Sequence, residues 1–244
     1  MAKQKKRIGS NGTRNIILNL LPQKEFSGLQ KHLEYVPLNF KQVLFEPDEP
    51  ISHIYFANTG VVSVVATVQE GGSVEVATIG NEGMVGLSSF FGSRSLPLRA
   101  LSQIPGDAFR MKVEVFEREI SKNNSLSKII RRYSQALFIQ LAQTVACNRI
   151  HSVEERCAKW LLQTQDRVNA SEFPLTQEFL GQMLGVRRAT VNTVARTLQK
   201  AGLIEYVRGW IKITDREGLE NSCCDCYEII KKEFEDFANM TPNS

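Results

Sequence analysis

The chain has 244 residues and a formal net charge of +4, with 42% hydrophobic and 23% charged residues. This composition is typical of a folded protein and excludes disorder of the chain as a whole. The apolar runs are too short for a membrane span, and no secretory signal follows the basic N-terminus. Five cysteines without a framework spacing favour a reducing, cytoplasmic location, and the length accommodates one large or two small domains.

The charges are strongly segregated along the chain. Residues 1–14 form a basic N-terminal arm with a charge of +5, residues 176–214 carry +4, and residues 215–244 carry −5. A basic cluster beside an acidic tail is typical of a nucleic-acid-binding segment. An ordinary solvated surface would explain the charges equally well. The secondary structure predicted for residues 176–214 therefore has to distinguish a nucleic-acid-binding segment from such a surface.

The first half of the chain predicts a β-rich domain. Residues 15–35 show apolar residues at helical spacing, which predicts one or two short helices. Over residues 36–115, short β-branched runs alternate with turn residues, and Gly71-Gly72 separates Val61–Val68 from Val74–Ile79 like a hairpin turn. This pattern predicts a small antiparallel barrel or roll.

A long helix is predicted next, with Ser125 as its cap and an end near Arg149. At about 1.5 Å per residue it would be roughly 37 Å long, which exceeds what one small barrel can cover. Its mostly apolar stripe therefore predicts a dimer interface, the alternative being an ordinary packed surface helix. The stripe consists of Ile130, Tyr133, Leu137, Leu141, Thr144 and Asn148. A break near His151 predicts a hinge before a second helix.

Residues 174–214 carry the clearest functional pattern. Thr176 is a good N-cap for a helix of about eight residues, and Gly185 supplies the left-handed conformation that ends it. A second helix starts near Arg187, and two short strands flank Arg208-Gly209. Helix, glycine turn, helix and β-hairpin in this order predict a winged helix-turn-helix, the alternative being a helical hairpin used only for packing.

The second of these helices would present an arginine-rich side to solvent. Its N-terminal amides and positive charge favour phosphates and base edges in a major groove. Arginine can bond bidentately to guanine and asparagine to adenine, while basic residues of the wing are placed for phosphates. The predicted DNA-binding residues are Thr176, Gln177, Arg187, Arg188, Thr190, Asn192, Thr193, Arg196, Arg208 and Lys212.

These segments together resemble the Crp/Fnr superfamily of bacterial transcription regulators over residues 15–220. The resemblance implies an α+β fold with a cyclic-nucleotide-binding-type β-roll over 15–120 and a dimerisation helix over 121–151. It implies a C-terminal winged helix-turn-helix domain over 152–244, which ends in the acidic tail helix. A homodimer that binds a two-fold symmetric promoter site is implied as well, with RNA polymerase as a further partner.

The recognition helix differs from that of the family's catabolite activator protein, which opens Ser-Arg-Glu-Thr-Val-Gly-Arg. The matching stretch, Arg187 to Thr193, retains Arg188 and Thr190 but has Ala189 and Thr193 in place of the base-reading Glu and Arg. The resemblance therefore implies a winged-helix DNA binder that recognises a different operator.

An effector site is implied by the segment Gly80 to Gly86, which resembles the turn of the family's phosphate cassette. This turn is reshaped relative to the family pattern, Pro97 follows the Arg-Ser pair closely, and Pro105-Gly106 interrupts the next strand pattern. A cyclic nucleotide is one ligand for this site; the alternatives are another signal, or a loop that has kept its shape and lost the nucleotide. The implied effector residues are Glu82 and Gly83 at a ribose, Arg94 and Ser95 at a phosphate, and Asn148 from the long helix.

The cysteines do not predict a metal site. Residues 1–35 contain no cysteine, so the iron–sulfur cluster of the Fnr branch is not expected. The run Cys223-Cys224-Asp225-Cys226 supplies at most three of the four ligands that a structural metal needs, and the histidines are scattered. If residues 217–238 form one helix, Cys223 and Cys226 lie on its apolar face with the aromatic residues. Core packing is therefore expected, with a redox switch or metal site as the alternative.

The sequence thus predicts a sequence-specific DNA-binding transcription regulator rather than an enzyme. It has no Walker-type phosphate loop, no nucleophile elbow and no metal-ligand pair on a helix. The alternative function is a ligand-sensing module that acts through a protein partner and retains a vestigial DNA-binding domain. In the main hypothesis, an effector in the β-roll would reorient the DNA-binding domain through the long helix and the hinge near His151.

Overall fold

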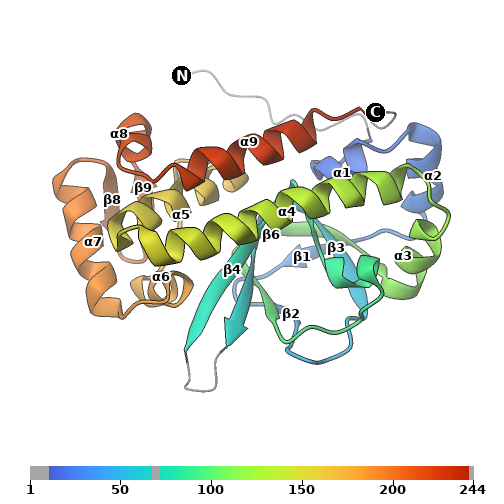
Figure 1. Cartoon of the computed structure of the whole chain (residues 1–244), viewed down its shortest axis with the longest axis horizontal. Helices are drawn as coiled ribbons and strands as arrows, with labels where there is room; N and C mark the ends of the chain where they lie inside the picture. Colours follow the sequence, from blue (N-terminus) through green and yellow to red (C-terminus); the bar gives the residue numbers. More distant parts are fainter. Residues whose placement is uncertain (1–10, 68–71, 242–244) are drawn as a thin grey trace.

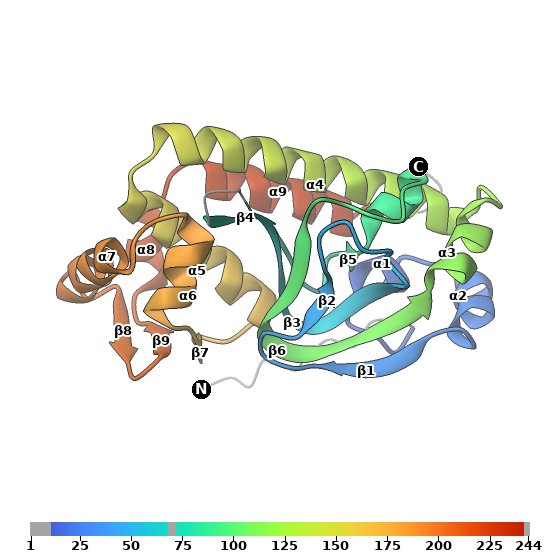
Figure 2. The ribbon, with the colours of Figure 1, turned by 90° about the horizontal axis from the view of Figure 1, so that it is seen from below.

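The computed structural model describes residues 11–67 and 72–241. A β-rich domain lies under the long helix α4 (Ser125–Ile150), and a C-terminal domain lies at one end of the molecule (Figure 1). The last helix, α9 (Cys226–Ala238), returns beside α4, and Figure 2 shows both helices covering the same side of the β domain. Lys3, Lys5, Lys6 and Arg7 of the predicted basic arm lie outside the described residues.

Two short helices open the described chain, as predicted. Helix α1 (Ile16–Asn19) is capped by Asn15, whose side-chain oxygen accepts a hydrogen bond from the Leu18 amide at 3.1 Å. Helix α2 (Gln23–Gln30) follows and buries Phe26 and Leu29.

The β domain is antiparallel throughout, which confirms the predicted roll. Its strands are β1 (Glu34–Leu38), β2 (Val43–Phe45), β3 (His53–Thr67), β4 (Ser73–Ile79), β5 (Met84–Val85) and β6 (Arg99–Lys112). The sheet order is β1-β6-β3-β4, while β2 pairs with β6 and β5 with β3. β3 and β4 pair as a hairpin with Thr67 opposite Ser73, and Gly71 of the predicted turn lies outside the described residues.

The predicted interruption at Pro105-Gly106 is wrong, because β6 continues through both residues. The register between β3 and β6 shifts in this region, and such bulges accommodate a proline that cannot donate to the ladder. A Cβ atom on Gly106 would lie 2.2 Å from the Thr59 carbonyl oxygen, so only glycine permits this close approach of the two backbones.

The short helix η1 (Leu87–Phe91) follows β5, and helix α3 (Val113–Ile120) follows β6 and contacts η1 and α4. Asn124, rather than the predicted Ser125, caps α4, since its side-chain oxygen accepts from the Ser127 amide. The chain breaks at His151, where predicted, and Ser152 begins the next helix with a capping box. The use of this break as a hinge stays a prediction.

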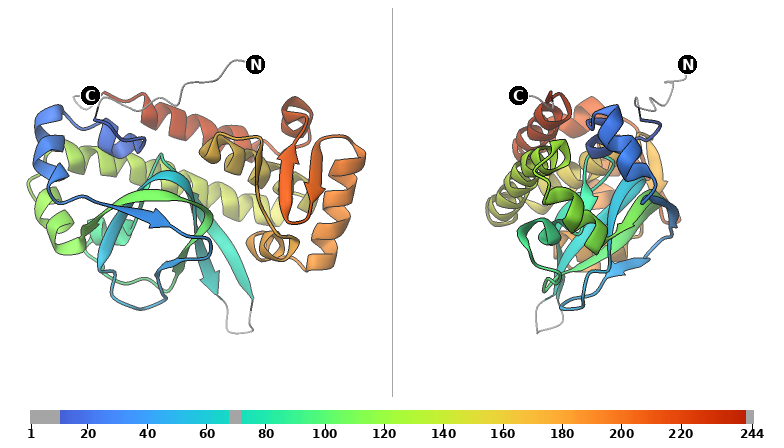
Figure 3. Two further views of the ribbon diagram at one scale, coloured as in Figure 1. Left: turned by 180° about the vertical axis from the view of Figure 1, so that it is seen from behind. Right: turned by 90° about the vertical axis from the view of Figure 1, so that its right-hand side faces the viewer.

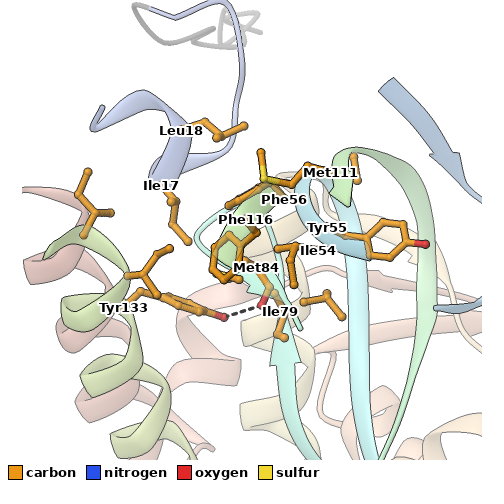
Figure 4. Packing of buried hydrophobic residues seen from close by; sticks show 14 of the residues in the cluster. Ile17, Leu18, Ile54, Tyr55, Phe56, Ile79, Met84, Met111, Phe116 and Tyr133 are labelled. Atoms are coloured by element: carbon orange, nitrogen blue, oxygen red, sulfur yellow. Dashed lines mark hydrogen bonds between the residues drawn. The ribbon is translucent and has the colours of Figure 1, made fainter. Parts of the chain in front are cut away.

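The first half of the predicted interface stripe of α4 is buried inside a single chain. Ile130 and Tyr133 are 0% and 1% exposed, and Leu137 is also buried. The Tyr133 hydroxyl points into the β-roll and donates to the Met84 carbonyl oxygen at 3.4 Å (Figure 4), while the Phe237 ring of α9 lies 5.8 Å from the Tyr133 ring. The β-roll and α9 thus cover Ile130, Tyr133 and Leu137, whereas Leu141 and Thr144 are half-buried and Asn148 is exposed. The use of this stripe as a dimer interface stays a prediction.

The C-terminal domain contains a three-stranded sheet of order β7-β9-β8 and a set of helices. Figure 3 (left) shows the orange strands β8 and β9 side by side at one end of the molecule. The elements are α5 (Val153–Val168), β7 (Glu172–Pro174), α6 (Gln177–Leu184), α7 (Arg188–Lys200), β8 (Ile204–Val207), β9 (Trp210–Ile213) and α8 (Arg216–Asn221), followed by α9. Within the described residues no helix combines the length and hydropathy needed to cross a membrane.

Residues 217–238 do not form one helix, because α8 ends at Asn221 and α9 starts at Cys226. α8 packs on α5 and buries Leu219, whereas α9 packs along α4. Tyr227, Ile230 and Phe237 of α9 are buried, as the apolar pattern predicted.

Candidate DNA interface and effector region

Helices α6 and α7 form the predicted helix-turn-helix. The Thr176 hydroxyl caps α6 by accepting from the Phe179 amide at 3.2 Å, and Gly185 ends the helix with φ +64. The turn is tight, since the Val186 amide donates to the Gly181 carbonyl oxygen at 2.9 Å. A Cβ on Gly181 would lie 2.9 Å from the Val186 carbonyl oxygen, so this position favours glycine.

Helix α7 has one buried and one exposed side, as its periodicity predicted. Val191, Val194, Ala195 and Leu198 are buried in the domain core. The first turn carries no acidic residue, so the amide dipoles and the arginines at this end are not offset within the turn. The exposed predicted residues are Arg187, Arg188, Thr193 and Arg196, and Thr190 and Asn192 are half-buried.

The wing is a two-residue hairpin between β8 and β9. Arg208 and Gly209 have φ of 49 and 82, which is the left-handed pair that a type I′ turn requires. Arg208 is exposed at the tip, while Lys212 forms an ion pair with Glu205 at 3.4 Å. Trp210 at the same tip was not predicted. It is 50% exposed, because buried and exposed side chains alternate along β9.

The wing and the start of α6 lie side by side. The Leu175 amide donates to the Gly209 carbonyl oxygen at 2.8 Å. Thr176 and Gln177 therefore lie next to the turn Arg208-Gly209 of the wing. These two predicted residues and Arg208 are thus close together on the domain.

The effector region differs from the predicted arrangement. Glu82 is 7% exposed and accepts from Arg167 Nε at 2.8 Å and from the Gly80 amide at 3.0 Å. Arg167 belongs to α5, so this buried ion pair joins the β domain to the C-terminal domain. Arg167 was not predicted, because no sequence pattern around it indicates an ion pair with a residue as distant in the chain as Glu82.

Arg94 is engaged elsewhere, on the surface of the β domain. It pairs with Glu117 and with Glu114 of α3, and its side chain is 46% exposed. A cavity of about 580 Å³ is lined by Glu82 and Arg167 but not by Arg94. Gly83, Ser95 and Asn148 do not line it either. The predicted effector residues are therefore not gathered around this cavity, because Glu82 and Arg94 are held by different helices.

A second cavity lies between the sheet and α4. It has a volume of about 350 Å³ and almost entirely apolar walls, which include Val64, Met84, Leu87 and Leu141. Asn148 lines a much smaller space of about 30 Å³, together with Glu75 and Gln140. The apolar cavity was not foreseen, because its walls come from segments far apart in the chain.

Glu75 is a further buried carboxyl at the contact between the two domains. Its two oxygens accept from Trp160 Nε1 of α5 at 2.9 Å and from the Ser63 hydroxyl at 2.6 Å. Burial raises the pKa of Glu75 to about 7, against the lowering effect of those two bonds and of the charges of Arg167 and Lys159. The folded protein therefore binds a proton at Glu75 more tightly than the unfolded chain does.

Glu75→Gln is expected to remove a pH dependence of stability. With the folded pKa raised from 4.5 to about 7, the wild type should lose free energy of unfolding as pH rises across this interval, by up to about 3 kcal/mol. Urea unfolding between pH 5 and pH 8 should show the variant losing less stability than the wild type, with the exposed Glu205→Gln as control. An unchanged pH slope in Glu75→Gln would contradict the assignment.

Four side chains that can bind a metal lie together in the structure, although they come from two distant segments of the chain. Cys147 and His151, at the end of α4, meet Cys224 and Cys226, and their ligand atoms all lie within 4.8 Å of one another. The count of three ligands that argued against a metal is therefore wrong, since α4 supplies two more. Cys157 is buried in the core of the C-terminal domain.

Comparisons with known proteins agree with this architecture. Residues 36–123 match the family model of the cyclic nucleotide-binding domain, and residues 155–222 match that of the Crp-like helix-turn-helix domain. No curated protein sequence matches the chain.

Solved structures share the fold at low sequence identity. FixK2 from Bradyrhizobium japonicum is 19% identical with a TM-score of 0.68, over 79% of this chain and 98% of that one. A putative crp/fnr-family regulator from Eubacterium rectale is 18% identical with a TM-score of 0.63, over 84% and 96%. CLP from Xanthomonas campestris, a c-di-GMP responsive global regulator, is 15% identical with a TM-score of 0.63, over 79% and 99%.

The two family models together match more than half of the chain, in the order sensor domain and then DNA-binding domain. In the structure the β-roll and the winged helix-turn-helix lie within these two matched regions, and α4 lies between them in the chain. The chain belongs to the Crp/Fnr family of transcription regulators.

Proposed function

We propose that the protein acts as a homodimer that binds a two-fold symmetric DNA site through α7 and regulates transcription there. The observation that carries this proposal is the exposed, acid-free N-terminal turn of α7 beside the Arg208 wing. Half-sites would lie about one helical turn apart, as in other dimeric helix-turn-helix proteins. RNA polymerase is the partner proposed for the DNA-bound form in the bacterial cytoplasm.

The proposed dimer contact is the outer face of α4. Phe138 and Val145 lie two turns apart on this helix and are 70% and 72% exposed. Neither the β-roll nor α9 covers them. Large apolar side chains in such a row favour pairing with an identical helix. The row has the three-and-four spacing of a coiled-coil seam and consists of Arg131, Gln135, Phe138, Ala142, Val145 and Arg149.

The proposed DNA contacts divide into two classes. Arg188 and Asn192 of α7 are assigned to base edges, where arginine and asparagine give bidentate contacts. The wing tip at Arg208 and the α6 start at Thr176 are assigned to the phosphate backbone, which fixes the register of the helix. The remaining predicted residues are assigned to backbone and groove contacts around these, namely Gln177, Arg187, Thr190, Thr193, Arg196 and Lys212.

An effector, in this proposal, would occupy the apolar cavity of about 350 Å³ beneath α4. A cyclic nucleotide needs free protein groups for its ribose and its phosphate. Glu82 is already paired with Arg167, and Arg94 with Glu117. We therefore propose an apolar or amphipathic ligand. Such a ligand would act by preferring one arrangement of α4 relative to the DNA-binding domain.

Arg188→Ala tests the proposed recognition. Loss of one bidentate base contact should cost about 1–3 kcal/mol, which is roughly a 5- to 150-fold loss of affinity for the operator. Binding is measured at constant salt on the operator found by genome-wide mapping and on scrambled DNA of equal length. Lys200→Ala, an exposed base in the last turn of the same helix, is the matched control.

The expected result is a loss for Arg188→Ala that is larger on the operator than on scrambled DNA, and a small, sequence-independent loss for Lys200→Ala. Equal losses on both DNAs would show that Arg188 contacts only the backbone. A wild type without any operator preference would favour the alternative function, a sensor that acts through a protein partner.

A further inference from the structure

A compact cluster of sulfur and nitrogen atoms lies where α4 ends. The Cys147 and Cys224 sulfurs are 3.5 Å apart, and the Cys226 sulfur is 3.6 Å from His151 Nδ1. The three cysteines are buried and His151 is half-buried. This arrangement leaves one side of the cluster accessible through the histidine.

The local structure explains why these four residues meet. Cys147 and His151 are four residues apart, which places them on one face of α4, and the His151 amide still donates to the Cys147 carbonyl oxygen at 3.1 Å. Cys224 lies in the break between α8 and α9, Cys226 is the first residue of α9, and the Tyr227 amide donates to the Cys224 carbonyl oxygen. The break turns both thiols toward α4.

The distances match a mononuclear metal site. With a metal–sulfur bond of about 2.3 Å, tetrahedral geometry places neighbouring ligand atoms about 3.8 Å apart, and the four ligand atoms lie within 4.8 Å of one another. A disulfide would need sulfurs at about 2.05 Å. A four-iron cluster binds each ligand to a different iron, which requires a wider spacing. Three thiolates and one imidazole suit zinc rather than magnesium or calcium, which prefer oxygen ligands.

The surroundings also fit a bound cation with thiolate ligands. Three thiolates and a divalent ion carry one net negative charge, and Lys159, only 6% exposed, lies close enough for its charge to act on Cys147 and Cys226. On the opposite side of the ring, His151 Nε2 lies 3.8 Å from an Asp225 carboxylate oxygen. At this distance the exposed Asp225 carboxylate makes no hydrogen bond to the ring and adds only its negative charge.

We propose that Cys147, His151, Cys224 and Cys226 bind one zinc ion, with His151 ligating through Nδ1 and the thiol protons released to solvent on binding. The ion would join the last turn of α4 to the start of α9, at the point where the chain passes from the long helix into the DNA-binding domain. Zinc would thereby hold α9 over α4 and restrict the break at His151.

The first test is the metal content of the full-length protein, prepared without a histidine tag and under reducing conditions. Inductively coupled plasma mass spectrometry should find about one zinc per chain. Replacement of this metal by Co²⁺ should give the intense visible absorption of a tetrahedral cobalt–thiolate site. Because both measurements use the wild type, they do not depend on whether a variant folds.

Variants then assign the ligands. Cys226→Ser and His151→Ala should lose stoichiometric zinc. Cys223→Ser is the matched control, since it carries the same substitution in the same loop but lies outside the four-ligand cluster. It should retain one zinc per chain.

Three results would overturn the proposal. One is a wild type that holds no zinc and gives no cobalt–thiolate absorption after reconstitution. Another is iron with acid-labile sulfide on these cysteines. The last is a Cys147–Cys224 disulfide, found by mass spectrometry of the unreduced protein, in a chain that binds no metal. Loss of zinc in Cys223→Ser would show that the assigned ligand set is wrong.

Discussion

Phe138→Glu is expected to make the protein monomeric and to reduce its affinity for a symmetric operator by roughly 100- to 10,000-fold, the usual gain from joining two binding modules. The Phe138 side chain is 70% exposed on a single chain, so the substitution should leave the monomer folded. In a dimer paired along α4, the two carboxylates would enter one apolar seam, where burial and like charge oppose association.

Analytical ultracentrifugation measures the change in mass, and circular dichroism checks that the helices are retained. Lys24→Glu is the control, because Lys24 is exposed on the separate helix α2 and the substitution adds the same carboxylate away from the row through Phe138 and Val145. A Phe138→Glu protein that stays dimeric would exclude this face of α4 as the interface. A monomer that keeps full operator affinity would exclude the two-fold mode of DNA binding.

Arg167→Met is expected to lower the free energy of unfolding by about 3–5 kcal/mol, since it leaves the buried Glu82 carboxylate without its partner. Both side chains of this ion pair are less than a tenth exposed. Arg167 also donates to the Thr78 carbonyl oxygen and to Gln140 Oε1, at 3.3 Å each. The substitution therefore removes contacts from α5 to both the β domain and α4.

Chemical unfolding measures this loss, with Arg94→Met as the surface control. Arg94 pairs with Glu117 in solvent, where ion pairs contribute little, so its loss should barely move the unfolding midpoint. The double variant Glu82→Gln with Arg167→Met should be more stable than Arg167→Met alone, because the unpaired charge is then absent. If the double variant is the less stable of the two, the loss comes from the contacts of Arg167 rather than from the uncovered carboxylate.

The helix-turn-helix was predictable because its determinants are local. The Thr176 cap, the left-handed Gly185 and the buried side of α7 all act within one or two helical turns. Side chains so close in sequence meet in nearly any tertiary context, and the structure reproduces the predicted elements to within a residue or two. The wing was predictable for the same reason, since Arg208-Gly209 defines its turn.

The faces of the long helix were not predictable in the same way. The apolar periodicity of α4 shows that Ile130 and Tyr133 contact apolar groups, but not whether those groups belong to the same chain. The answer depends on α9, which the chain break before Cys226 directs along α4. The proposed seam through Phe138 and Val145 is recognisable only after the covered side is known.

The sequence by itself determined the family, the order of the domains and the DNA-reading elements, because short-range periodicity, caps and turns encode them. Only the tertiary structure decided the partners of Glu82 and Glu75, the covered face of α4 and the meeting of Cys147 with Cys224. Those contacts join residues far apart in the chain, and their positions follow from packing whole elements against one another. No local pattern specifies which distant element will supply the partner.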